Sequence, residues 1–113
     1  MNVNPKLKAL EEVTGYPVAQ DEYEGTSDKY IVFTYEDERP ALWGDNRETA
    51  RTVWLMVCLF VPKGYDYFGD KDKIETELTR QGFNIESCQV WLEEARKGTE
   101  KIRRVTISVN YTE

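Results

Sequence analysis

The most apolar stretch of this chain lies at its centre, between residues 53 and 61, where every side chain is hydrophobic. As a β-strand it would show apolar side chains on both faces of a sheet, because successive side chains point to opposite faces. One face would carry Val53, Leu55, Val57, Leu59 and Val61, and the other Trp54, Met56, Cys58 and Phe60. A small two-layer domain ordinarily covers one face of its sheet, so we expect the other face to be the functional surface.

Three further strands are predicted around this central one. Residues 30–35 are β-branched or aromatic, which favours a strand before it. Residues 85–94 and 100–111 form two more strands, joined by a turn around Lys97-Gly98 and therefore paired as a hairpin. Apolar and polar residues alternate from Val105 to Thr112, which predicts one buried and one solvent-exposed face for the last strand.

A first helix is predicted near the amino end of the chain. Asn4 is a suitable N-cap, and Pro5 is tolerated at the first helical position because its missing N–H would have no partner there. Leu7 and Leu10 follow at helical spacing, and Gly15 ends the element.

A second helix is predicted from Asp70, taken as its N-cap, to Gly82, taken as its left-handed end. Phe83 follows that glycine, where an apolar residue typically packs back on the last turn, here on Leu78. This is the best-specified boundary in the sequence.

Residues 36–50 contain Pro40, Gly44 and the Asp45-Asn46 pair without a clean period, which predicts a long loop of functional importance. The expected order is helix, strand, strand, helix, strand, strand. We therefore predict one α+β domain over residues 1–113, with a mainly antiparallel four-stranded sheet and two helices packed on it.

Composition narrows the classes of function. The 113 residues carry a net charge of -6, which does not favour nonspecific attraction to nucleic acid or to anionic membranes. No apolar stretch has the length of a membrane span, and the amino end lacks the pattern of a signal peptide, so we expect a cytosolic protein.

Candidate chemistry is sparse. The chain has no histidine, no phosphate-binding glycine pattern and no metal-ligand spacing, so we expect neither an enzyme nor a cofactor or metal site. The many carboxylates are typical of a solvated surface. Cys58 and Cys88 lie in strand-like runs and are interpreted as reduced core thiols, with a disulfide between them as the alternative.

The second apolar face of the central strand therefore becomes the main candidate site. Trp54, Met56 and Phe60 would expose about 400 to 600 Å² if open to water, the size of a typical interaction patch. Either one helix covers each face, or the loop around Trp43 folds back over the second face, or a partner subunit covers it. We favour the partner and take Trp54, Met56, Phe60 and Trp43 as interface candidates.

Turn and strand patterns extend along nearly the whole chain. They are Gly15-Tyr-Pro-Val18, Tyr23-Glu-Gly25, Asp28-Lys-Tyr-Ile-Val-Phe33, Asp45-Asn46 before Arg51-Thr-Val-Trp-Leu-Met-Val57, the helix end at residues 78–83, and Arg104-Val-Thr-Ile-Ser-Val-Asn-Tyr111. With the order of elements, they resemble the short tail-completion proteins of siphophages and prophages, a family that includes tail terminators and tail-to-head joining proteins.

This resemblance implies a structural protein that forms a ring, often of six subunits, at the head-proximal end of the tail tube. Its partners would be itself, the tail-tube protein and a head-connector or neck protein, first in the bacterial cytoplasm and then in the virion tail. DNA would pass through the ring without specific binding, and no membrane would be involved. The long loop would contact the tube or a neighbouring subunit, with Arg39, Asp45, Asn46 and Arg47 as assembly-loop candidates.

Two alternatives stay open at this point. A phage neck, or head-completion, protein would give a similar pattern of elements. A cytosolic protein-binding module or adaptor would use the apolar sheet face for a different partner, binding it stoichiometrically and forming no ring.

Overall fold

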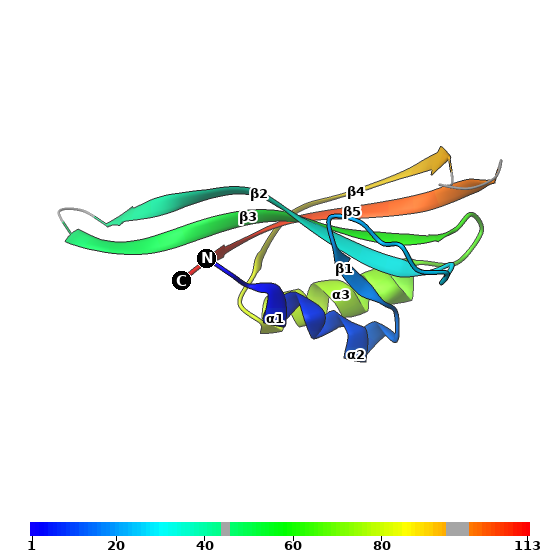
Figure 1. The fold of residues 1–113 in the computed structure, drawn as a ribbon, viewed down its shortest axis with the longest axis horizontal. Helices are drawn as coiled ribbons and strands as arrows, with labels where there is room; N and C mark the ends of the chain where they lie inside the picture. Colours follow the sequence, from blue (N-terminus) through cyan, green and yellow to red (C-terminus); the bar gives the residue numbers. More distant parts are fainter. Residues whose placement is uncertain (44–45, 95–99) are drawn as a thin grey trace.

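The computed structural model describes the backbone of residues 1–43, 46–94 and 100–113, and their side chains except at positions 41–43 and 46–49. One five-stranded sheet, in the order β1-β2-β3-β5-β4, carries all helices on one side (Figure 1). β1 pairs with β2 in parallel, and the other neighbours are antiparallel. The elements are α1 (Asn4–Lys8), α2 (Leu10–Thr14), β1 (Val18–Gln20), β2 (Tyr30–Trp43), β3 (Asn46–Pro62), α3 (Phe68–Arg80), β4 (Asn84–Glu94) and β5 (Lys101–Thr112).

The amino-terminal region differs from the prediction in two ways. The expected single helix is two short helices that meet at Ala9, and the three-residue strand β1 was not predicted at all. Asn4 is the first helical residue and not the cap, because its side chain is engaged elsewhere: it accepts a hydrogen bond from Tyr35 Oη and donates to Gln20 Oε1 at 3.1 Å. The sheet is therefore mixed and five-stranded rather than antiparallel and four-stranded.

The prediction of a long loop over residues 36–50 is wrong, because β2 and β3 continue their backbone pairing through residues 37–43 and 46–50. The register runs on from Asp37 opposite Trp54 to Trp43 opposite Asn46, with an irregularity between Tyr35 and Asp37. We call residues 37–43 and 46–52 the arm. The arm projects beyond the helices at the left of Figure 1, and the molecule measures 55 × 22 × 22 Å.

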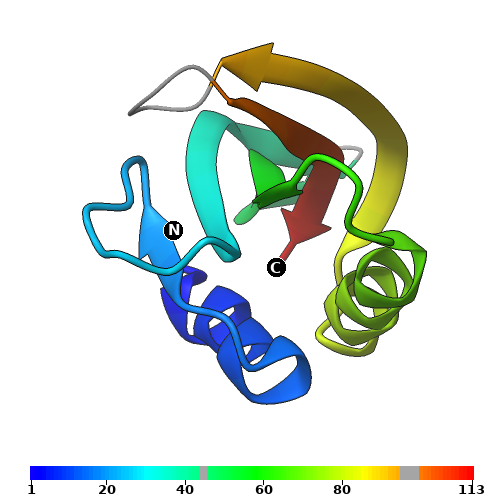
Figure 2. The same ribbon diagram turned by 90° about the vertical axis from the view of Figure 1, so that its right-hand side faces the viewer.

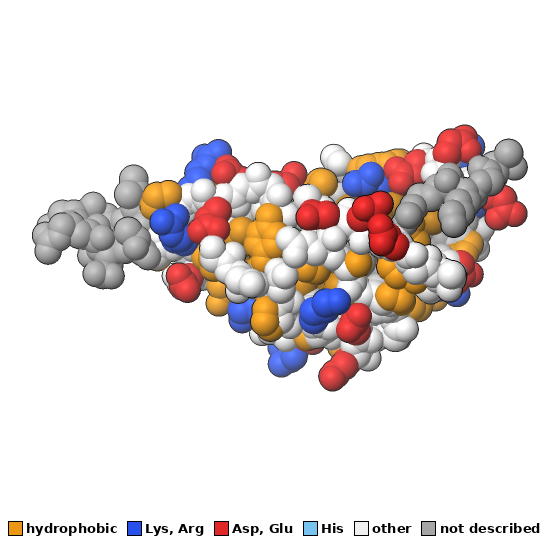
Figure 3. Space-filling model, in the orientation of Figure 1, with side chains coloured by type: hydrophobic (Ala, Val, Ile, Leu, Met, Phe, Trp, Pro, Cys, Tyr) orange, Lys and Arg blue, Asp and Glu red, His pale blue; other side chains and the backbone are white. Residues whose placement is uncertain are grey.

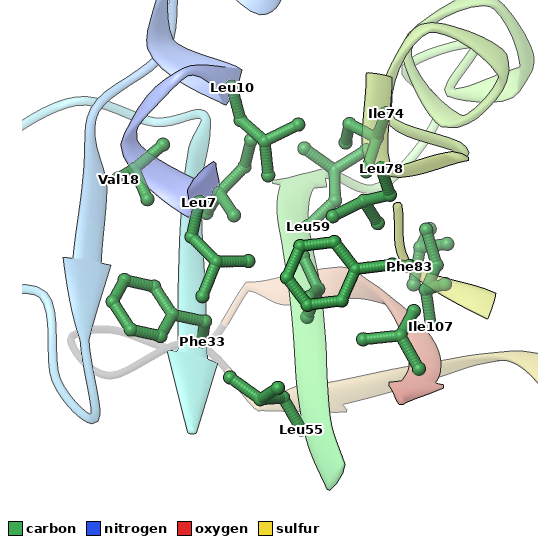
Figure 4. Close-up of a cluster of buried hydrophobic side chains, with 14 of the residues drawn as sticks. Leu7, Leu10, Val18, Phe33, Leu55, Leu59, Ile74, Leu78, Phe83 and Ile107 are labelled. Atoms are coloured by element: carbon green, nitrogen blue, oxygen red, sulfur yellow. The ribbon is translucent and has the colours of Figure 1, made fainter. Parts of the chain in front are cut away.

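The hydrophobic core lies between the helices and one face of the strongly curved sheet (Figures 2 and 4). All five core-facing residues of β3 have no solvent exposure, and Leu7, Leu10, Ile74 and Leu78 of the helices are equally buried. The predicted division of β3 into two faces is thus confirmed. The alternative with one helix on each face is wrong, because α1, α2 and α3 all pack on the same one. We call the opposite face the outer face.

The predicted end of the second helix is confirmed in detail. Gly82 has a left-handed φ of 100°, Gly82 N donates to Thr79 O at 3.0 Å, and Phe83 N donates to Leu78 O at 2.9 Å. This is the double hydrogen bond of a Schellman motif, which satisfies the last carbonyl groups of the helix. Phe83 and Leu78 then enter the core together, as expected (Figure 4).

The predicted start of that helix is wrong, because α3 begins at Phe68 and Asp70 lies buried in its first turn. Asp70 Oδ2 accepts a hydrogen bond from Tyr16 Oη at 2.6 Å, and Tyr16 Oη lies 2.9 Å from Tyr65 Oη. Burial, with the hydrogen bonds to Asp70 and Tyr65, raises the pKa of the Tyr16 phenol, so it stays protonated. The carboxylate therefore ties the end of α2 to the start of α3.

Both cysteines are free, and the sheet register places Cys58 on the outer face and Cys88 on the core face.

In the described part of the chain, no helix is long and apolar enough to cross a membrane.

The difference between the two faces predicts unequal effects of truncation. Leu59→Ala should lower the free energy of unfolding by about 3 kcal/mol, because it leaves a cavity in a closed core. Met56→Ala should lower it by about 1 kcal/mol, since that half-buried side chain leaves no enclosed void. Urea denaturation of both variants measures the difference, and equal losses would show that the outer face is packed as tightly as the core.

Candidate interaction surface

A row of stacked side chains crosses the outer face. The register aligns Tyr30 of β2 with Phe60 of β3, Phe60 with Arg104 of β5, and Arg104 with Trp91 of β4. The rings of Tyr30 and Phe60 stack at 4.9 Å between centroids, and Tyr23 stacks on Tyr30 at 4.4 Å. The Arg104 guanidinium lies 5.6 Å from the Phe60 ring and 5.1 Å from the Trp91 ring. One cation thus joins two aromatic side chains from strands that are not neighbours.

Arg104 also covers part of the outer face. Its Nη2 lies 3.6 Å from Cys58 Sγ, and its Nη1 donates to Glu93 Oε2 at 3.4 Å. Burial works against the charged form, but the contacts with Cys58 and Glu93 outweigh it and raise the pKa of Arg104. Arg104 Nε is buried and has no hydrogen-bond partner among the described residues. The guanidinium therefore closes the sheet surface over Cys58, which is only 4% exposed.

The predicted interface residues Trp54, Met56 and Phe60 do lie together on the outer face, but each is half-buried. Trp54 Nε1 donates to Glu86 Oε2 at 3.3 Å, and the Arg39 guanidinium lies 5.4 Å from the Trp54 ring. Long polar side chains from β2 and β4 thus cover part of Trp54, and Arg104 of β5 covers part of Phe60. On the side of the molecule that Figure 3 shows, apolar surface is interrupted by charged groups. The exposed apolar area is therefore smaller than the sequence predicts.

The most exposed large hydrophobic residues were missed by the sequence analysis. Phe68 is 64% exposed, Leu92 39% and Trp91 37%. Leu92 and Trp91 lie near the end of β4, and Arg103 packs over Tyr67 at 6.0 Å, which brings the start of α3 to the same end of the molecule. The only sequence signal was an uncharged Trp-Leu pair in a predicted strand.

The arm carries the remaining candidates at the opposite end. Arg39 is exposed and pairs with Asp37 at 2.8 Å, next to Trp54. Asp45 lies outside the described residues, as do the side chains of Trp43, Asn46 and Arg47. The structure thus brings Arg39 and Trp54 together but separates the arm from the stacked row.

An open hollow lies where the arm leaves the body of the molecule. It has a volume of about 510 Å³ and is lined by Met1, Asn2, Asn4, Gln20, Tyr35, Glu36, Asp37 and Glu38. The Met1 ammonium group and Glu38 Oε1 form an ion pair of 2.7 Å at its edge. Across residues 1–43, 46–94 and 100–113, no group of three or more cysteine or carboxylate side chains is placed to hold a metal ion.

Comparison with known proteins identifies a similar fold. A chain from the virion of a native gene transfer agent particle matches with a TM-score of 0.53 and 12% sequence identity, over 97% of this chain and 90% of that one. No protein-family model matches the sequence, and no curated protein is similar to it. At this identity the likeness concerns the fold.

The position of Arg104 predicts the reactivity of Cys58. In a Cys88→Ser background, Arg104→Ala should speed labelling of Cys58 by a maleimide at alkaline pH on the order of tenfold, because it uncovers the thiol. Arg103→Ala is the matched control, since Arg103 lies on the other face over Tyr67. An unchanged rate in Arg104→Ala would contradict the assignment of Arg104 as the cover.

Proposed function

We propose that this chain is a structural tail-completion protein of a phage or prophage. It forms a ring at the head-proximal end of the tail tube, ends tube polymerisation and joins tail to head. The observation that carries the proposal is the fold shared with a chain of a gene transfer agent virion over nearly the full length of both chains. The sequence patterns that resemble tail-completion proteins support it independently.

The one-sided core is consistent with this role. All helices pack on one face of the sheet, so the outer face, with its stacked row and Trp54, is free to meet another subunit. Repetition of one contact between two different patches closes into a ring when the rotation allows it. The role is structural, with no catalysis and no cofactor.

The arm replaces the predicted loop as the segment that contacts the tail tube or a neighbouring subunit. Its described residues 37–40 are exposed, and an isolated two-stranded ribbon is marginally stable in water. We infer that the arm gains its stability from a neighbouring subunit or from the tail-tube protein. Arg39, Asp45, Asn46 and Arg47 are the contact candidates within it.

The charge of the chain suits a channel through which DNA moves. Each copy carries -6, so a ring of six would carry about six times that charge, and surface facing the lumen would repel DNA phosphates. The other partners of the ring are the tail-tube protein on one side and a head-connector or neck protein on the other. Assembly takes place in the bacterial cytoplasm, and the ring remains in the virion tail.

The proposal predicts a capping activity that depends on the arm. Added to polymerising tail-tube protein, the chain should form a ring at one end of each tube and stop its growth. A variant in which Asn-Gly replaces residues 40–51 should fold, because the core lies outside the arm, but should not cap tubes. Tube lengths in negatively stained electron micrographs measure both effects.

Three outcomes would contradict the proposal. Continued tube growth with bound chain would rule out termination. A ring found only on heads would identify a neck protein. Stoichiometric binding to a protein outside the virion, without a ring, would identify an adaptor.

The outer face should matter more for assembly than for folding. Trp54→Ala and Phe60→Ala should abolish most ring formation while each lowers the free energy of unfolding by only about 1 to 2 kcal/mol, because both side chains are half-buried. Sedimentation velocity measures assembly, and urea denaturation measures stability. Normal rings together with a large loss of stability would place both residues in the core of the monomer.

A further inference from the structure

Two of the open strand edges of this sheet are protected against further pairing. At β1, Val18 N donates to Glu11 Oε2 at 3.1 Å and Lys8 Nζ donates to Val18 O, so side chains of the helical region occupy the backbone groups. At the β2 side of the arm, Glu38 N donates to Asp37 Oδ1 at 2.8 Å, and Pro40 has no N–H to offer. Such capping and proline placement prevent strand addition.

The edge of β4 has no such protection. Glu113 N donates to Arg51 O at 3.0 Å, which marks residues 51 and 113 as a hydrogen-bonded pair between β3 and β5. The registers from β3 to β5 and from β5 to residues 87–94 are regular, so the alternation can be followed across the sheet. It directs the N–H groups of Cys88, Val90 and Leu92 outward. In the part of the chain that the structure describes, these three groups have no hydrogen-bond partner.

The side chains of this edge also favour pairing. Residues 87–92 are uncharged and contain no proline, and Trp91 and Leu92 are exposed at the edge. The charges stand only at its borders, as Glu86 on one side and Glu93 and Glu94 on the other. An uncharged, exposed edge of this kind is a template for another strand.

Two occupants are disfavoured by the geometry. A second β4, paired antiparallel about Val90, would place Glu86 opposite Glu94 twice, and like charges directly opposite destabilise a sheet. The arm of the same chain projects from the opposite end of a 55 Å molecule, so it does not reach this edge (Figure 1).

We propose that the outward edge of β4 is a strand-addition site for the arm of a second copy of this chain, and that the β3 side of that arm, at residues 46–50, pairs with it. This inference rests on the proposed ring and names the contact that builds it. β5 ends at Thr112 opposite Thr52, so among the described residues no strand lies beside residues 46–50 on that side.

Strand number and charge support this occupant. The arm has two strands, and β4 would supply the third that a ribbon needs for stability. The arm strand of β3 carries Arg47 and Arg51 against one acid, Glu48, so its net charge is opposite to that of the glutamates bordering the β4 edge. The contact joins two different patches, so it repeats around a ring rather than stopping at a pair.

A mixing experiment tests this contact. Val90→Pro removes one outward N–H and leaves the ladder with β5 intact, so this chain keeps its arm but loses its edge. The variant with Asn-Gly in place of residues 40–51 keeps its edge but loses its arm. Each should be monomeric alone, and their mixture should form a one-to-one heterodimer in native mass spectrometry.

Hydrogen exchange locates the contact within that heterodimer. In the ¹⁵N-labelled arm-deleted chain, the amides of Cys88, Val90 and Leu92 should exchange at least about tenfold more slowly once the Val90→Pro chain is added. The amides of Ser87 and Gln89, already bonded to β5, should change little. Val90→Thr is the matched control, because it keeps the N–H and should assemble as the unmodified chain does.

Several results would overturn the inference. These are the absence of a heterodimer, self-association of the arm-deleted chain, or a heterodimer whose protection lies outside residues 88–92. If Val90→Pro does not fold, Leu92→Lys blocks the same edge by charge and replaces it in the mixture. Rings on tail tubes without the heterodimer would retain the proposed function and refute this contact, whereas a heterodimer without capping would do the reverse.

Discussion

One feature determines the architecture: residues 53–61 of β3 are apolar on both faces, and the helices of this structure cover only one of them. On the covered face its five side chains are fully buried against α1, α2, α3 and the neighbouring strands. That burial supplies the hydrophobic free energy of folding. The other face must either meet water or meet a partner, and the proposed ring takes the second course.

Contacts within the monomer reduce, but do not remove, the free-energy cost of exposing the uncovered apolar face to water. Arg104 stacks between Phe60 and Trp91 and shields Cys58, and Arg39 lies over Trp54. Such cation contacts keep the face soluble while leaving rigid aromatic side chains near the surface, which are the residues that typically anchor protein interfaces. The same molecule carries an unprotected strand edge at one end and an unsupported ribbon at the other. Together these features support a subunit that is completed by its neighbours.

The sequence predicts the parts of the fold that local periodicity and turn chemistry determine. Alternation along β3 assigns its two faces correctly, and Gly82 with Phe83 gives the end of α3. Prediction from the sequence fails for elements that form by pairing between residues far apart in the chain. The arm contains a proline and several charged residues, and its described residues 37–40 lie outside the core, so it has no strand period to detect. β1 has three residues and exists only through its pairing with β2.

The candidate site shows the same division. The sequence places Trp54, Met56 and Phe60 on one face. It does not show that Arg39 and Glu86 contact Trp54, or that Arg104 contacts Phe60, because these residues come from other strands and no local pattern relates them. The exposure of Trp91 and Leu92 follows from the position of β4 at the sheet edge, and the order of strands sets that position.

We propose that this fold leaves a face and an edge that only further copies of the chain complete. Native mass spectrometry of the unmodified chain over a range of concentrations tests this proposal. We expect one closed ring whose subunit number does not change with concentration, because a heterologous contact that closes leaves no free patch. A monomer at every concentration, or a two-fold dimer that grows no further, would contradict it.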